Sequence, residues 1–152
     1  MKLAISHLLI FILSCYVLAC SVPKAVEQEK PLPTGDYRYT SLDKSGAKVV
    51  EGRLSVTSVE PRRIEKETQI QIKGNWQLNK VGNQEHIGPQ VGSGELIGSI
   101  IEGEIRLDLN PNINDANVIL RGKVEGKRLH GTWSFKGYAG TISEGTFEAI
   151  RQ

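Results

Sequence analysis

The chain has 152 residues, 39% of them hydrophobic and 24% charged, and this length suits one domain with a hydrophobic core of its own. Its 19 Lys and Arg residues against 17 Asp and Glu residues give a formal net charge of +2. So small a charge excess does not predict nucleic-acid binding, which depends on a strongly basic surface. The short basic clusters around Arg62 and Lys127 are interrupted by acids and indicate solvated surface.

The first residues have the pattern of a secretory signal peptide. Lys2 supplies a positive charge, residues 3–19 are apolar except at three positions, and small Ala19 ends the run. The run is marginal in length for a membrane-spanning helix, and no basic flank follows it. We therefore predict that residues 1–19 are a signal peptide.

The stretch Val17-Leu18-Ala19-Cys20 resembles the lipobox of prokaryotic lipoproteins, in which small or apolar residues precede an obligatory cysteine. The resemblance implies cleavage before Cys20, a diacylglycerol on its sulfur, and usually a further acyl chain such as palmitate on its new amino group. Two alternatives stay open. Ile12-Leu13-Ser14-Cys15 fits the same pattern but leaves a shorter apolar region, and a plain secretory signal would be cut after Ala19.

The lipobox also predicts where the protein resides. Two or three acyl chains hold a protein permanently at a membrane, whereas one chain gives reversible binding, so we expect a lipid-anchored protein of the cell envelope. In a source with two membranes, lipoprotein sorting implies the outer membrane, because aspartate directly after the lipid-bearing cysteine favours inner-membrane retention and this chain has Ser21. Both cysteines, Cys15 and Cys20, lie at or before the cleavage site, so the mature domain forms no internal disulfide.

The composition changes at Gly35. Residues 20–34 hold three prolines among Lys, Glu and Gln and are predicted to be the lipidated cysteine and a flexible tether. All 16 glycines lie between Gly35 and Gly145, and between them run short segments in which apolar and polar residues alternate. This pattern is typical of an all-β domain, which we assign to residues 35–152.

The alternating segments and the turn sequences between them define the strands. Asp43-Lys44-Ser45-Gly46 is a tight-turn sequence between two such segments, so neighbouring strands are antiparallel. Each segment also contains glycine, any residue and a large apolar residue in succession, as in Gly131-Thr132-Trp133. Glycine on the inner face lets a strand coil sharply, as a small closed barrel requires. We predict eight strands, at residues 35–42, 47–58, 68–79, 92–100, 103–110, 117–125, 128–136 and 143–151.

The second half of this domain resembles a known architecture. The motifs Asn117-Val118-Ile119-Leu120-Arg121-Gly122, Gly131-Thr132-Trp133-Ser134 and Gly145-Thr146-Phe147-Glu148-Ala149-Ile150-Arg151 resemble the C-terminal half of bacterial calycin-like β-barrel domains. That architecture also includes lipocalins and avidins. The resemblance implies a single eight-stranded, antiparallel, up-and-down β-barrel.

Residue types that carry catalysis are few in the mature chain. Its histidines, His86 and His130, lie far apart in sequence, and no cysteine follows Cys20, so no zinc-ligand spacing is present. The asparagine-rich stretch after residue 109 does not match a calcium loop, because the obligatory glycine position holds Asp115 and the glutamate position holds Arg121. We therefore expect no catalytic residues, no metal and no cofactor.

The inward-facing residues are the remaining candidate site. They form either a plain core or the lining of a ligand cavity: Tyr37, Tyr39, Leu54, Trp76, Leu107, Leu120, Trp133 and Phe135. An eight-stranded barrel is either just filled by side chains or holds one small ligand, and the sequence does not decide between the two.

Two functional hypotheses follow. The first is a membrane-anchored, non-catalytic binding module for a small apolar ligand or for a protein partner in the envelope. The second is a structural or accessory lipoprotein with a filled barrel and no ligand. A large open interior would favour the first hypothesis and a packed interior the second.

Overall fold

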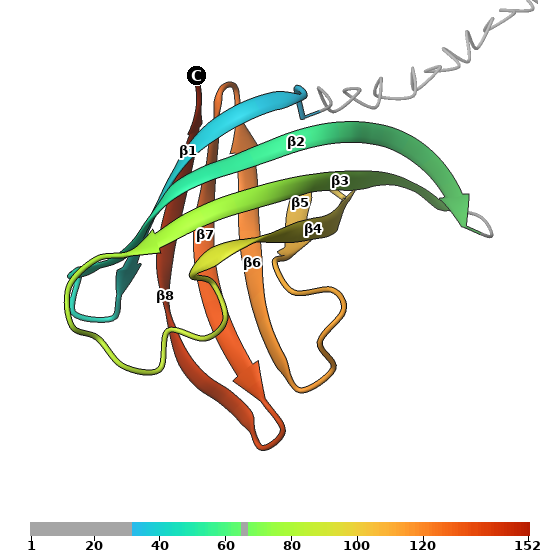
Figure 1. Cartoon of the computed structure of the whole chain (residues 1–152). Coiled ribbons are helices and arrows are strands. Elements are labelled where there is room, and N and C mark those ends of the chain that lie inside the picture. The colour runs from blue at the N-terminus through green and yellow to red at the C-terminus, as the bar shows by residue number, and fades with distance from the viewer. Residues whose placement is uncertain (1–31, 65–66) are drawn as a thin grey trace, which may run out of the picture.

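The computed structural model describes residues 32–64 and 67–152. Eight antiparallel strands close into one up-and-down barrel, in which each strand pairs with the next and β8 pairs with β1 (Figure 1). The strands are β1 (Gly35–Asp43), β2 (Lys48–Ile64), β3 (Glu67–Lys80), β4 (Gly92–Ile101), β5 (Glu104–Asp108), β6 (Ala116–Glu125), β7 (Arg128–Gly137) and β8 (Gly140–Arg151). The predicted all-β barrel is confirmed. The described residues contain no helix that could cross a membrane.

The largest difference from the predicted strands is the length of the β2–β3 hairpin. β2 continues beyond residue 58 and stays paired with β3 as far as Ile64. The pairing of β1 with β2 starts only at Val56, and the pairing of β3 with β4 ends at Ile70. The outer part of the hairpin, residues 61–64 of β2 and 67–69 of β3, is paired with no other strand. We call it the arm, and it projects from the barrel as a two-stranded ribbon (Figure 1).

Two other strands differ in length for local reasons. β5 ends at Asp108 instead of residue 110, because the Asp108 carboxylate accepts the backbone N–H of Asn110 at 2.9 Å and turns the chain. β8 begins at Gly140 instead of residue 143, because a tight hairpin pairs it with Gly137 of β7.

The inner face of the barrel is the face that the alternation predicted. Trp76 and Trp133 are buried, whereas Gln77 and Thr132, one residue along, are exposed. Of the predicted inward-facing residues, seven are buried, namely Tyr37, Tyr39, Leu54, Trp76, Leu107, Leu120 and Trp133, and Phe135 is partly buried against them. One contiguous core therefore runs through the barrel.

Glycines on the inner face allow the strands to coil. Gly122 of β6 and Gly131 of β7 lie directly opposite each other. A Cβ atom at Gly131 would lie 2.0 Å from the carbonyl oxygen of Arg121, and one at Gly122 would lie 1.9 Å from that of His130. Only hydrogen fits at either position, so the two strands approach more closely than side chains would permit.

The barrel has two distinct ends because consecutive connections alternate between them. The end that we call the tether end holds the start of β1, the tip of the arm, the β4–β5 and β6–β7 turns and the C-terminus (Figure 1). The opposite end, the loop end, holds the connections 44–47, 81–91, 109–115 and 138–139. The described chain thus enters the barrel at the end from which the arm projects.

We expect the Gly131→Ala substitution to lower the free energy of unfolding by about 2–3 kcal/mol, because the added methyl group must displace the backbone of β6. The neighbouring Thr132→Ala substitution, on the exposed face, should change it by about 0.5 kcal/mol or less. Denaturant unfolding of both variants measures the contrast. Equal losses would contradict the close approach of β6 and β7.

Candidate functional site: the barrel interior and its ends

Trp133 spans three strands inside the barrel. Its indole lies beside Gly145, its partner on β8, where a Cβ atom would lie 2.8 Å from Nε1. Beyond Gly145, the Nε1–H group donates a hydrogen bond of 2.8 Å to the carbonyl oxygen of Leu42 on β1. Trp133 therefore joins β7 to β1 across β8, at the strand pair that closes the barrel.

Trp76 repeats this arrangement on the other side of the barrel. Its indole lies against Gly94, its partner on β4, where a Cβ atom would lie 2.8 Å from the ring. Its Nε1–H group donates to the carbonyl oxygen of Leu109 at 2.6 Å and contacts that of Glu95 at 3.1 Å. The pairing of β4 with β5 begins at Ile97, so Trp76 bridges a seam where residues 92–96 have no partner on β5.

Other inward side chains belong to the same core as the two indoles. Tyr39 stacks on Phe147 with ring centroids 6.0 Å apart, and Tyr39, Leu54, Leu107 and Leu120 have no exposed surface. Both indole N–H groups are satisfied by backbone carbonyls, as buried tryptophans require. These residues are packed against one another in the described interior.

The tether end is covered by the chain that precedes β1. Leu32 is 2% exposed and belongs to the core. The Tyr37 hydroxyl donates to the carbonyl oxygen of Pro33 at 2.6 Å, and the Arg151 guanidinium donates to that of Thr34 at 2.9 Å. The last three residues of the predicted tether 20–34 therefore pack on the barrel. Cys20 and the predicted signal peptide lie outside the described residues.

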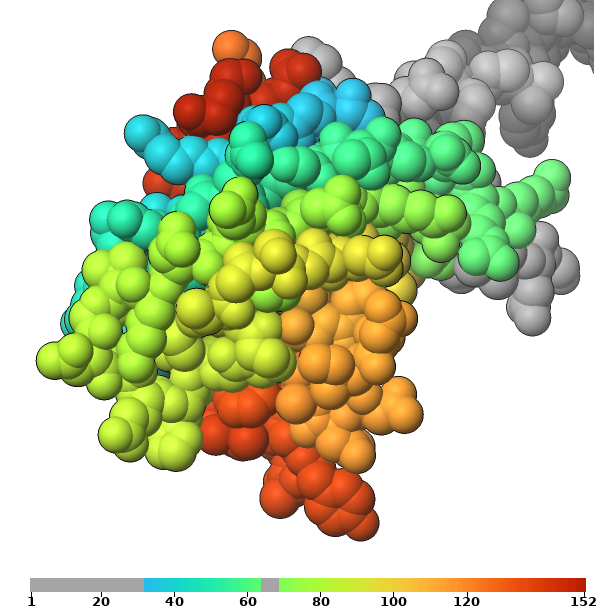
Figure 2. All heavy atoms as spheres, in the orientation of Figure 1, coloured from blue at the N-terminus to red at the C-terminus, as the bar shows by residue number. Residues whose placement is uncertain are grey.

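The loop end is covered by the β3–β4 connection. Ile87 joins the core, and Gly88 lies so close to Phe135 that a Cβ atom would be 2.7 Å from the ring. The Asn110 side chain donates to the carbonyl oxygen of Pro89 at 2.7 Å and fixes the loop. The space-filling view shows the yellow-green atoms of this loop against the red-orange atoms of the β7–β8 hairpin (Figure 2). Residues 81–91 thus form a plug over this end.

The interior contains hydroxyl groups but no charged side chain among the buried residues. Tyr39 Oη and Ser41 Oγ are buried, and neither makes a hydrogen bond of good geometry with the described atoms. Burial raises the pKa of Tyr39 well above its usual value, and the nearby Ser41 hydroxyl opposes this only in part. Tyr39 therefore stays neutral wherever the protein is folded at ordinary pH.

The residues with catalytic potential do not converge. His86 lies exposed in the plug, while His130 lies on the outer face of β7 with Nε2 at 3.2 Å from a carboxylate oxygen of Glu125. Within residues 32–64 and 67–152 there is no group of three His, Cys, Asp or Glu side chains placed as metal ligands. The asparagine-rich stretch after β5 makes structural contacts, because the Asn117 amide donates to the Asp108 carboxylate at 3.0 Å and stabilises the turn.

Some residues that close the ends gave only a weak signal in the sequence. Leu32 stands among prolines and charged residues, and Ile87 stands in a polar loop. Asn110 lies in a stretch predicted as a turn, but nothing in the pattern indicates that its side chain holds the plug. A lone apolar residue within a polar connection is the single hint that the sequence offers.

Comparisons of the chain with protein-family models, with curated protein sequences and with solved structures return no match.

Truncating either tryptophan to alanine should cost about 3–5 kcal/mol of stability, because each removal opens a cavity and leaves a backbone carbonyl without its donor. The controls Gln77→Ala and Thr132→Ala, on the exposed face, should cost about 0.5 kcal/mol or less. Denaturant melts give these values. A tryptophan truncation that the protein tolerates as well as its control would contradict a packed interior.

The Tyr39→Phe substitution should not destabilise the protein at neutral pH, because the lost hydroxyl has no good partner. Above about pH 10 the unfolded tyrosine ionises while buried Tyr39 stays protonated, so the stability of the wild type falls as pH rises. The stability of the variant should fall less steeply with pH, as measured by urea midpoints between pH 8 and pH 11. Parallel curves would show that Tyr39 is not buried.

Proposed function

We propose that this chain is an exported lipoprotein whose calycin-like barrel is a non-catalytic module acting on a protein partner in the cell envelope through its outer surface and rim loops. The packed interior, covered by Leu32 at one end and by the plug at the other, argues against a small apolar ligand. The observation that supports a protein partner over a purely structural role is the group of exposed apolar side chains at the loop end, above all Tyr138. A small apolar ligand would have to displace Trp76 or Trp133 and break their hydrogen bonds. The outer surface is therefore the better candidate for contacts.

The loop end offers apolar contacts at its rim. Tyr138, at the tip of the β7–β8 hairpin, is 92% exposed, and Ile142 on the same hairpin is 52% exposed. Ile113 and Val91, in the neighbouring connections, are also more than two-fifths exposed. Exposed aromatic and aliphatic side chains are typical of protein contact surfaces. A purely structural lipoprotein with a filled barrel remains the alternative and does not need this rim.

The proposed lipid anchor would be attached at the end of the barrel opposite this rim. Leu32 lies at the tether end and is the twelfth residue after Cys20, a separation that spans about 40 Å when fully extended. Acyl chains on Cys20 would hold the tether end nearer the bilayer and leave the loop end free to meet a partner. Ser21 supports residence in the outer membrane where the source has two membranes.

The Cys20→Ser substitution should abolish incorporation of labelled palmitate, because the thiol is the site of lipidation. The matched control is Cys15→Ser, which removes the other cysteine of the apolar run and should leave labelling intact. Metabolic labelling followed by immunoprecipitation measures both. If Cys15→Ser abolishes labelling and Cys20→Ser does not, the anchor assignment is wrong.

A photo-crosslinking residue at position 138 should form a specific adduct with one envelope protein in living cells. The same residue at position 77, on the exposed side wall of β3, is the control and should not form that adduct. If position 138 forms no adduct and the folded protein binds an apolar fluorescent probe saturably, the ligand hypothesis is favoured instead.

A further inference from the structure

A groove crosses the outer face of the barrel over β8, β1, β2 and β3, with a volume of about 510 Å³. Its floor includes Gly52, where φ is +153° and a Cβ atom would lie 2.2 Å from the carbonyl oxygen of Gln77. The side chains around this floor are mostly polar or charged: Arg38, Thr40, Lys48, Glu51, Asn79, Glu148 and Ile150. The core residue Tyr39 also lines the groove, which is otherwise a polar depression in the outer wall.

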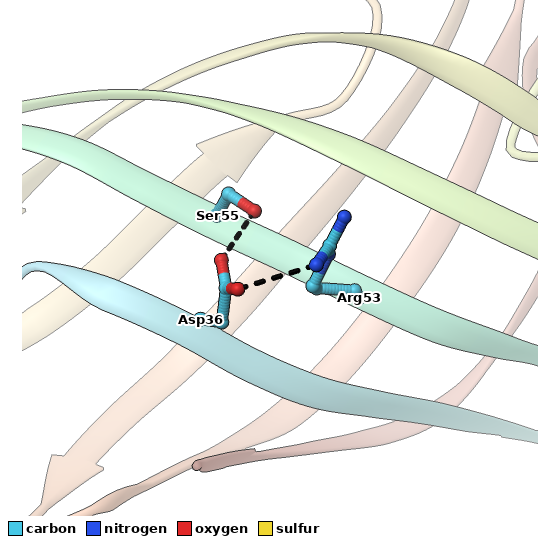
Figure 3. Close-up of polar contacts among 3 residues, drawn as sticks. All are labelled: Asp36, Arg53 and Ser55. Carbon is cyan, nitrogen blue, oxygen red and sulfur yellow. Dashed lines mark hydrogen bonds and ion pairs between the residues drawn. The ribbon is translucent and has the colours of Figure 1, made fainter.

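Two arginines face each other beside this groove. Arg38 on β1 is the direct cross-strand partner of Arg53 on β2, and like charges in such positions destabilise a sheet. Arg53 is compensated by Asp36 at 3.3 Å, and the other oxygen of that carboxylate accepts a bond of 2.6 Å from Ser55 (Figure 3). Asp36 is therefore already engaged by both neighbours.

The two carboxylates that line the groove are engaged as well. Glu51 pairs with Lys48 at 3.1 Å, and Glu148 pairs with Arg128. Within the described part of the chain, no ion pair involves Arg38, and its side chain is exposed. Among the described residues its guanidinium is thus not held in an ion pair, although the Glu51 and Glu148 carboxylates line the same groove.

An adjacent groove serves as an internal comparison. It shares Thr40 and Glu148 with the first groove and continues over β7, with a volume of about 390 Å³. In this groove Arg128 contacts Glu148, and His130 lies 3.2 Å from Glu125. The adjacent groove therefore differs from that of Arg38, whereas a third groove, over β4, β5 and β6, also places two arginines directly opposite each other, Arg106 and Arg121.

We propose that the groove over Gly52 binds a polar ligand with a phosphate or carboxylate group, and that Arg38 pairs with this anion. A guanidinium suits both groups because it offers parallel N–H donors to two oxygens. Thr40 on β1 and Asn79 on β3, the cross-strand partners of Glu51 on either side, supply hydrogen-bonding groups for the polar body of the ligand. Bound anion would also neutralise the Arg38–Arg53 repulsion. The proposal goes beyond the protein-contact function and does not depend on it.

The test titrates the full-length protein in a neutral detergent with glycerol 3-phosphate and follows backbone amide resonances. We expect saturable shifts at Arg38, Thr40 and Asn79, and no such shifts with glycerol. The Arg38→Gln substitution should weaken the affinity at least about tenfold, the usual scale for loss of a charge-assisted pair. The matched control is Arg62→Gln, which removes an exposed arginine of the arm and should leave the affinity unchanged.

A second arm of the test identifies the source of the anion. The protein is placed in phosphatidylcholine nanodiscs with or without phosphatidylglycerol, and the same resonances are followed. Shifts that need phosphatidylglycerol and vanish in Arg38→Gln assign the site to a lipid headgroup, whereas shifts with glycerol 3-phosphate alone assign it to a soluble ligand. Absent shifts in both arms, or equal weakening by Arg62→Gln, overturn the proposal. Unchanged melting temperatures of both variants exclude unfolding as the cause of any weaker binding.

Discussion

The interior of an eight-stranded barrel is only about as wide as the side chains that fill it, and this constraint governs the whole molecule. Two tryptophans fill much of that width here. Each lies over a glycine of the next strand and donates its indole N–H to a carbonyl beyond that strand, Trp133 over Gly145 and Trp76 over Gly94. A side chain on either glycine would displace the ring, so the large and the small residue depend on each other.

The same constraint directs contacts to the outside. Because the core occupies the interior and Leu32 and the plug cover its ends, the rim loops and the outer wall are the surfaces on which the proposed contacts rest. The wall also carries grooves over its inner-face glycines, since a strand that coils at a glycine leaves a depression on its outer side. The groove over Gly52 combines such a depression with Arg38, which makes no ion pair among the described residues.

Alternation and turn sequences predicted the strands well because each strand has one face toward the core and one toward solvent. The recurring glycine and apolar residue predicted correctly that both share the inner face, as at Gly131 and Trp133. The arm was missed because Pro61 and the arginines after it interrupt the alternation, although pairing with β3 continues there. Pairing between strands is not local in sequence, so no short pattern reveals it.

Long-range contacts also explain what the sequence did not predict about the site. The seam at residues 92–96 depends on where β5 turns away, and that turn depends on hydrogen bonds of Asp108 and Asn110. The plug depends on contacts between Gly88 and Phe135, which are far apart in the chain. Residue patterns report which face of a strand is buried, but they do not report what covers the ends of a barrel.

Hydrogen exchange of the two indole N–H groups tests the central claim most directly, because both are hydrogen-bonded inside a packed, closed barrel. If that claim is right, the Nε1–H resonances of Trp76 and Trp133 exchange with deuterium only through global unfolding, at the rate of the slowest backbone amides. Exchange of either indole within minutes under native conditions, while the strand amides stay protected, would show an interior open to water and would contradict it.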